Sequence, residues 1–190
     1  EELKGKLAAQ RRWAFDFVTT GTDPLTCSPI GVSFSFKPKQ AFYLSFQGAL
    51  SAREVLSSLK GLFEDPKIEK IGQNLKYEIL VLRNFGISLR GVWFDTMVAS
   101  YCLNPAKPNH NLDDIAMEHL GVRITSIQEL IGSGRNQRNM KDVELDRLTR
   151  YGCQDSDVTF RLAAGLGKNL EGADLRGLFE EIEMPLVPIL

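Results

Sequence analysis

The chain has 190 residues, of which 43% are hydrophobic and 25% charged, and 23 basic against 24 acidic residues give a formal net charge of −1. This composition is typical of a folded globular domain and excludes disorder, collagen-like repeats and coiled coil. The near-neutral balance also excludes a protein that grips nucleic acid by bulk positive charge. An anionic partner therefore has to be held at a local site.

The cysteines and the apolar stretches indicate a cellular compartment. Cys27, Cys102 and Cys153 are far apart and form no Cys-x-x-Cys pair, which argues for a reducing environment and against structural zinc. Apolar stretches are broken by charge or glycine well before the roughly 20 residues that a membrane span needs. No basic-then-apolar leader opens the chain. We expect a cytoplasmic protein with no membrane partner.

The first third of the chain predicts a meander of strands followed by a helix. Residues 1–12 are polar and basic, and we expect them to form only a lead-in. Ser51, with Glu54 three residues later, predicts a capping box at the start of a helix that runs to about residue 62. Apolar or alternating segments predict three antiparallel strands, over 13–18, 30–36 and 41–44.

After Asp65-Pro66 short strands and helices alternate, which favours a mixed sheet with helical crossovers. We expect one domain over residues 1–178, with 179–190 as the start of a helix whose apolar end is covered by a further domain. The predicted strands are 70–73 and 91–94. The predicted helices are 76–84, 95–103, 112–120, 126–131 and 143–170, the last with a possible break near 165–167, and 104–111 is a loop.

Three acids occupy places where a core-forming segment should be apolar. They are Asp16, Glu78 and Asp155. A bare buried carboxylate is costly, so a cluster of them usually implies a cation. Tyr151 lies four residues before Asp155, so the two share a helix face and can address one ligand together.

The segments around these acids resemble, in the correct order, the motifs of a known family. They are Phe15-Asp-Phe-Val-Thr19, Gly72-Gln-Asn-Leu-Lys-Tyr-Glu78, Leu89 to Met97, Tyr151-Gly-Cys-Gln-Asp155 and Ile182 to Pro188. The family is the 3′-5′ proofreading exonuclease domain of bacterial DNA polymerase I, the family A DNA polymerases of DNA replication and repair. The resemblance implies an α/β, ribonuclease H-like fold with a mixed central sheet flanked by helices. It also implies a polymerase domain, a nucleotidyltransferase, in the same chain after residues 179–190.

The resemblance further implies a reaction and its residues. In the family four acids hold two Mg²⁺ or Mn²⁺ ions around the last phosphodiester of a single-stranded DNA 3′ end, and the ions assist its hydrolysis. Asp16, Glu78 and Asp155 would be the catalytic and metal-binding acids, and Tyr151 would orient the attacking water. DNA-binding candidates are Gln73 and Asn74, with Arg135 and Arg138 in a basic loop that could equally be merely solvated. We expect a monomer.

Two of the four acid positions depart from the family pattern. Val18 stands where the family has glutamate, and it has no oxygen to bind a metal; Glu78 stands where the family has aspartate and is one methylene longer. We therefore expect a degenerate site, with exonuclease activity lost or strongly reduced and metal bound weakly or not at all. Whether the domain is still an enzyme stays open.

Several alternatives remain. The domain could be an active metal-dependent 3′-5′ DNA exonuclease with an altered metal site, or a ribonuclease D-like RNA exonuclease. Three residues also have simpler explanations. Glu78 could be an ordinary acid near a helix N-terminus, Asn74 a helix cap and Tyr151 a core aromatic.

Overall fold

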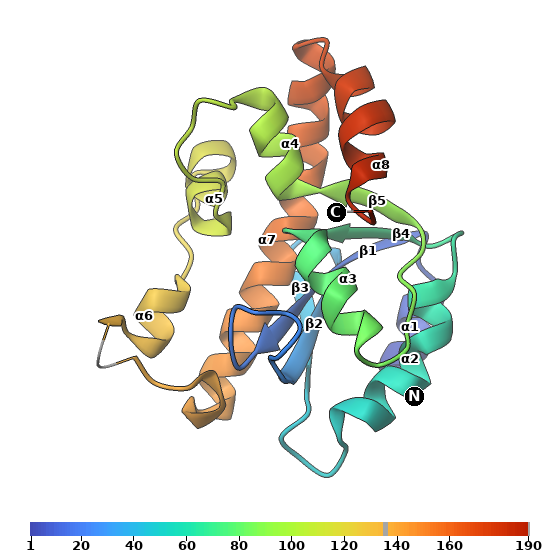
Figure 1. Cartoon of the computed structure of the whole chain (residues 1–190), viewed down its shortest axis with the longest axis vertical. Coiled ribbons are helices and arrows are strands. Elements are labelled where there is room, and N and C mark those ends of the chain that lie inside the picture. Colours follow the sequence, from blue (N-terminus) through green and yellow to red (C-terminus); the bar gives the residue numbers. More distant parts are fainter. Residues whose placement is uncertain (135–136, 190) are drawn as a thin grey trace.

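The computed structural model describes residues 1–134 and 137–189 and is built around a five-stranded mixed sheet (Figure 1). The strand order is β3-β2-β1-β4-β5; β1 pairs antiparallel with β2, β2 antiparallel with β3, and β1, β4 and β5 run parallel. The strands are β1 (Arg12–Thr19), β2 (Pro29–Lys37), β3 (Gln40–Ser45), β4 (Glu69–Gly72) and β5 (Val92–Asp95).

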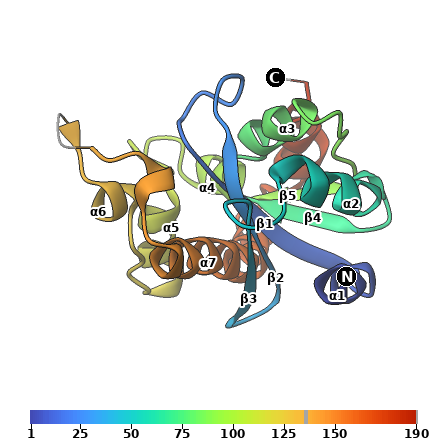
Figure 2. The ribbon, with the colours of Figure 1, turned by 90° about the horizontal axis from the view of Figure 1, so that it is seen from below.

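Helices cover both faces of this sheet (Figure 2). The long helix α7 crosses one face, where it contacts β1, β2 and β3, and α2 and α3 lie on the other. The helices are α1 (Glu2–Ala8), α2 (Ala52–Glu64), α3 (Leu75–Arg83), α4 (Thr96–Leu103), α5 (Leu112–Leu120), α6 (Ile127–Ile131), α7 (Leu145–Gly172) and α8 (Met184–Leu186), with a 3₁₀ turn η2 (Met140–Asp142) and a π-helical segment η3 (Leu178–Glu183).

The face under α2 is aromatic. Trp13 and Phe15 alternate along β1 on this face, and their ring centroids lie 5.5 Å and 5.3 Å from that of Phe63 of α2. Phe34 is the cross-strand partner of Phe15, and all four rings are almost completely buried. Burial of large rings in edge-to-face contacts makes this layer the main anchor of the sheet.

The face under α7 carries small side chains, and they allow a close approach of the helix. A Cβ atom on Gly152 of α7 would lie 2.9 Å from the Tyr43 ring and 3.4 Å from Ser33 Cβ. Ser33 is the register partner of both Asp16 and Tyr43, so these side chains share the α7 face. Small residues at this contact therefore bring α7, with its polar residues, directly over Asp16.

The structure confirms the predicted strands and most of the predicted helices, and the Ser51–Glu54 capping box forms. Two expectations were wrong. The polar lead-in contains α1, whose Leu7 is fully buried, and α7 runs unbroken through Gly165 and Gly167 because Leu162, Leu166 and Leu170 anchor it in the core.

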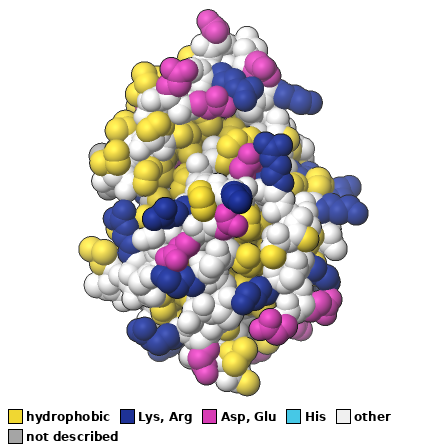
Figure 3. Space-filling model, turned by 90° about the vertical axis from the view of Figure 1, so that its right-hand side faces the viewer, with side chains coloured by type: hydrophobic (Ala, Val, Ile, Leu, Met, Phe, Trp, Pro, Cys, Tyr) yellow, Lys and Arg dark blue, Asp and Glu magenta, His cyan; other side chains and the backbone are white. Residues whose placement is uncertain are grey.

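The surface shows no field of a single sign on the side that carries η3 and α8. Basic and acidic side chains intermingle there, and hydrophobic side chains gather in the upper half of the view (Figure 3). Among the described residues, no helix is both long enough and apolar enough to span a membrane.

Candidate active site

Sheet register explains why Asp16 and Glu78 meet. The pairing of β1 with β4 ends at Ala14 and Ile71, whereas β1 continues to Thr19. Beyond that pairing the β4 side of β1 is open, and α3 begins there directly after β4 and carries Glu78. A hydrogen bond of 2.6 Å between the Thr19 hydroxyl and the Tyr77 hydroxyl fixes α3 to the end of β1. Glu78 is thereby held beside Asp16.

Asp155 reaches the same place from the opposite face, on α7. Its side chain is 5% exposed, and Gln154 Nε2 donates a hydrogen bond of 3.4 Å to Asp155 Oδ1. The negative charge of Asp16 raises the pKa of both Glu78 and Asp155, so the three predicted acids lie in one cluster. The structure therefore brings together side chains from β1, α3 and α7.

Burial raises the pKa of each of these acids. Burial lifts the pKa of Asp16 to about 7. The pKa of Glu78 and that of Asp155 are raised well above their ordinary values, first by burial and then by the neighbouring Asp16 charge. The backbone N–H of Phe17 opposes the rise at Glu78, but Glu78 Oε2 is buried with no hydrogen-bond partner among the described residues. The cluster is thus short of positive charge and of donors.

The tyrosine of the third motif lies next to this cluster. Burial, followed by the charges of Asp155 and Asp16, raises the pKa of Tyr151, so its hydroxyl is protonated at neutral pH. A second tyrosine that the sequence did not indicate, Tyr43 of β3, lies on the same face of the sheet. Its pKa is raised to about 12 by burial and by Asp16, and its hydroxyl has no partner within the described chain.

Val18 was predicted to stand at the fourth acid position of the family pattern, and its side chain is packed in the core. It is 2% exposed. The cluster around it joins β1 and β2 to α6, η2 and the start of α7, with Tyr43 and Tyr151 against its edge. Its buried members are Val18, Ile30, Leu130, Ile131, Met140, Val143 and Leu148. Position 18, for which the resemblance predicts an acid in the family, is an apolar core position in this chain.

The donor set does not fit a site for two divalent ions. Within residues 1–134 and 137–189, no group of three or more His, Cys, Asp or Glu side chains is arranged to hold a metal ion. Val18 supplies no oxygen, and three carboxylates remain to balance four positive charges. Metal binding by Asp16, Glu78 and Asp155 stays a prediction.

Asp95 organises the two helices next to the acid cluster. Its carboxylate accepts hydrogen bonds from the backbone N–H groups of Asn74 and Leu75 in α3, and of Met97 and Val98 in α4, over 2.6 to 3.2 Å. One buried carboxylate therefore caps both helices.

Gln73 holds the loop that follows α4. Its Nε2 donates to the carbonyl of His110 at 2.8 Å, and its Oε1 accepts from the Thr96 hydroxyl. Both ends of the amide are thus engaged within the chain, and a contact of Gln73 with DNA stays a prediction. Asn74 occupies the N-cap position of α3, in the left-handed conformation, with no side-chain cap.

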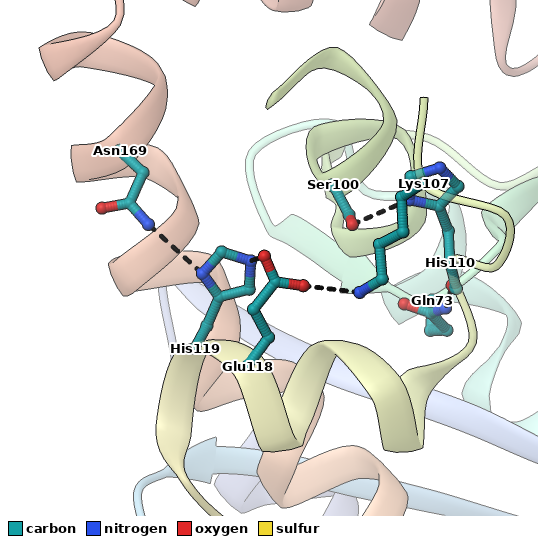
Figure 4. A network of polar contacts seen from close by, with 7 residues as sticks. All are labelled: Gln73, Ser100, Lys107, His110, Glu118, His119 and Asn169. Carbon is teal, nitrogen blue, oxygen red and sulfur yellow. Dashed lines mark hydrogen bonds and ion pairs between the residues drawn. The ribbon is translucent and has the colours of Figure 1, made fainter. Parts of the chain in front are cut away.

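Figure 4 shows how the 104–111 loop is tied to its neighbours. His110 Nδ1 and the Ser100 hydroxyl of α4 lie 2.8 Å apart. Lys107 pairs with Glu118 of α5 at 2.6 Å. His119 continues the network to Asn169 of α7. His110 is thus a structural contact of this loop.

The basic loop after α6 is only partly described. Arg135 lies outside the described residues. Arg138 is exposed, and its backbone N–H donates to the carbonyl of Ile131 at 2.9 Å. Its guanidinium can reach a phosphate at the surface, and the predicted DNA contact of Arg138 is untested.

The family model described as "3′-5′ exonuclease" matches residues 1–171. DNA polymerase I of Pseudomonas aeruginosa is 38% identical over 195 residues, covering 97% of this chain and 21% of that protein. DNA polymerase I of Borreliella burgdorferi is 29% identical, covering all of this chain and 21% of that protein. The chain therefore spans about one fifth of the length of these relatives.

Solved structures with the same fold come from several nucleases and a polymerase. The polymerase domain of Mycobacterium smegmatis Pol1 with DNA superposes at a TM-score of 0.76 and 18% identity, over 98% of this chain and 29% of that chain. Brucella melitensis NrnC gives 0.75 and 24%, over 95% and 83%. Escherichia coli RNase D, an exoribonuclease, gives 0.75 and 17%, over 99% and 47%. These likenesses confirm the ribonuclease H-like exonuclease fold.

Proposed function

The chain belongs to the 3′-5′ exonuclease domain family of DNA polymerase I, and from that premise we propose that it is the proofreading-type domain of a family A DNA polymerase with a degenerate site. It binds a single-stranded DNA 3′ end, and its hydrolytic activity is lost or strongly reduced. It works in replication and repair as a cytoplasmic monomer, and the polymerase domain follows in the same chain after residues 179–190.

The observation that carries this proposal is the packing of Val18. An acid at this position supplies a metal ligand in the family, whereas here the side chain is buried among hydrocarbon. A metal-assisted hydrolysis depends on ions that stabilise the attacking and leaving oxygens. Asp16, Glu78 and Asp155 would hold such an ion only as an incomplete set, and that ion would supply the activated water. The chain itself would contribute the positioning of the bound DNA strand, through Asp16 and Tyr151.

A single activity assay tests the proposal. A labelled single-stranded DNA oligonucleotide is incubated with the chain and Mg²⁺ or Mn²⁺, and binding is followed in parallel with EDTA. We expect binding without appreciable shortening of the DNA. Shortening that Asp155→Asn abolishes, at a rate typical of nucleases, would establish an active exonuclease instead.

That second candidate is favoured by one observation, the survival of two buried acids, Glu78 and Asp155, that each interact with Asp16. The same assay with an RNA oligonucleotide addresses the ribonuclease D-like alternative. Its only structural support is a shared fold, because RNase D is 17% identical. Preferential shortening of RNA would favour it.

A further inference from the structure

A cavity of about 470 Å³ opens beside the acid cluster, between the starts of α3 and α5, α4, the 104–111 loop and the end of η3. None of the four predicted catalytic residues lines it. A volume of this size is within the range of small-molecule sites. The side chains that matter for its chemistry are Asn74, Lys76, Tyr101, His110, Asn111 and Glu183.

Two asparagine amides on its wall are uncommitted. Asn74 and Asn111 occupy the N-cap positions of α3 and α5, where an asparagine side chain commonly accepts a backbone hydrogen bond. Neither caps its helix with its side chain within the described structure. Each amide offers both a donor and an acceptor to a ligand.

Hydrogen bonds fix the position of His110 in the cavity wall. The His110 carbonyl accepts a hydrogen bond from Gln73, and its Nδ1 is hydrogen-bonded to the Ser100 hydroxyl (Figure 4). His110 Nε2 is buried and has no partner among the described residues. Burial and the nearby Lys107 charge lower the pKa of His110, so the ring is neutral and its two nitrogens are one donor and one acceptor.

Tyr101 gives the cavity an open aromatic surface. Its side chain is 51% exposed, and its ring meets His110 edge-on, with centroids 5.6 Å apart at 72°. An edge-to-face neighbour covers at most one face of the Tyr101 ring, and the exposure of the residue leaves ring surface open to a ligand. Stacking on such a ring is how single-stranded nucleic acids are bound without sequence preference.

The charges of the cavity disfavour an anion. Asp95 and Glu183 line it together with one base, Lys76. The backbone N–H groups at the starts of α3 and α4, which could otherwise bind a phosphate, are taken by Asp95. A neutral ligand with hydrogen-bonding edges fits these walls better than a phosphate.

We propose that this cavity binds one uncharged nucleobase, stacked on Tyr101 and hydrogen-bonded by the Asn74 and Asn111 amides. The proposal deepens the proposed function, on which it rests, when the base belongs to the bound DNA strand. A free nucleoside presents the same chemistry.

The test is a titration of the ¹⁵N-labelled chain in EDTA with adenosine, with thymidine and with inorganic phosphate, followed by NMR. We expect both nucleosides to shift the signals of the cavity residues and phosphate to leave them unchanged. Tyr101→Ala should weaken nucleoside binding about tenfold or more, while Tyr101→Phe stays within about threefold. Met117→Ala, a residue of equal exposure on α5 outside the cavity, is the matched control and should bind like the wild type.

The same variants with a single-stranded oligonucleotide separate the two proposals. If nucleosides shift no cavity signal, or if folded Tyr101→Ala binds them normally, the base site is overturned. Oligonucleotide binding by that variant at wild-type strength would also overturn its role in the strand path, with DNA binding itself intact. If nucleosides bind and the oligonucleotide does not, the cavity stands and the proposed DNA function fails.

Discussion

The side chain of Val18 bears on whether the neighbouring acid cluster can bind a metal ion. Its neighbours Asp16 and Thr19 match the first motif of the family, yet its own side chain belongs to an apolar layer between β1 and α6. In the proposed degenerate site, a valine in place of a carboxylate lowers the negative charge available to a metal ion. The Val18 side chain is packed among apolar neighbours and offers no oxygen to a water or an ion.

Replacement of Val18 and Glu78 by the acids of the family pattern should restore metal binding. In Val18→Glu/Glu78→Asp we expect Mn²⁺ binding by calorimetric titration that the wild type lacks or shows only weakly, because four carboxylates again face one point. Val18→Glu alone, without metal, should lower the free energy of unfolding by roughly 2 to 4 kcal/mol, since it buries a carboxylate in hydrocarbon.

The control is Ile30→Glu, which places an acid in the same apolar layer on β2. It should destabilise comparably without any gain in Mn²⁺ binding. Equal metal affinity in the double mutant and the wild type would show that the motif residues do not map onto a metal site.

The raised pKa of Asp16 makes stability depend on pH. Its folded value of about 7 exceeds the ordinary 3.8, so the folded state favours the protonated acid. The stabilisation is complete below about pH 4 and is lost as the pH rises through 7. Without divalent ions, the free energy of unfolding by urea should fall by a few kcal/mol from pH 5 to pH 8, to which Glu78 and Asp155 contribute in the same direction.

Asp16→Asn should remove part of this decline and be more stable than the wild type at pH 8. Asp23→Asn, at an exposed acid whose pKa is lowered by local hydrogen bonds, should leave the decline unchanged. A stability that stays flat between pH 5 and pH 8 would contradict the burial of these carboxylates.

At the scale of elements, the contact of α7 with the sheet sets the position of Asp155 and Tyr151. Gly152→Ala would place a methyl group 2.9 Å from the Tyr43 ring, so either the ring or the helix has to move. We expect a loss of about 1 to 3 kcal/mol in the free energy of unfolding, measured by denaturant titration.

Gly165→Ala, in the same helix, provides the comparison. Apart from its chain neighbours and the helix's own nearby backbone, no described atom lies within 4 Å of its added Cβ, so the change should stabilise the helix by about 0.5 to 1 kcal/mol. If both substitutions acted alike, α7 would not be held at the sheet by close packing.

The elements were predictable where a local pattern encodes them. Period-two and helical patterns, with the Ser51 cap, were enough for the five strands and most helices. The pattern could not reveal α1, because only Leu3 and Leu7 of this segment pack on the core. It also suggested a break at Gly165 that the buried leucines of α7 prevent.

The site was predictable only in part, for a similar reason. The sequence identified Asp16, Glu78 and Asp155, because acids stand out in apolar segments. The sequence pattern could not predict contacts between residues that are far apart in the chain. Examples are the Thr19–Tyr77 hydrogen bond across 58 positions and the Asp95 cap of α3 across 20.

For the whole molecule, a net charge of −1 limits how DNA can be bound. We expect only a few phosphate contacts, since the near-neutral balance of 23 basic and 24 acidic residues excludes binding by bulk positive charge. With two or three contacts, affinity for a single-stranded oligonucleotide in EDTA should fall about tenfold between about 50 and about 200 mM salt, by fluorescence anisotropy.

Arg138→Ala should lower the slope of this dependence by about one phosphate contact. Lys4→Ala, at a partly exposed base on α1, should leave the slope unchanged. Affinity that does not depend on salt would exclude phosphate contacts and leave the domain a scaffold role.

Asp95 has a further consequence for motion. Because one carboxylate accepts hydrogen bonds from the first turns of α3 and α4, displacement of either helix strains the hydrogen bonds of the other. Glu78 lies on α3 and Tyr101 on α4. We therefore expect a ligand that displaces Tyr101 to disturb the position of Glu78 in the acid cluster as well.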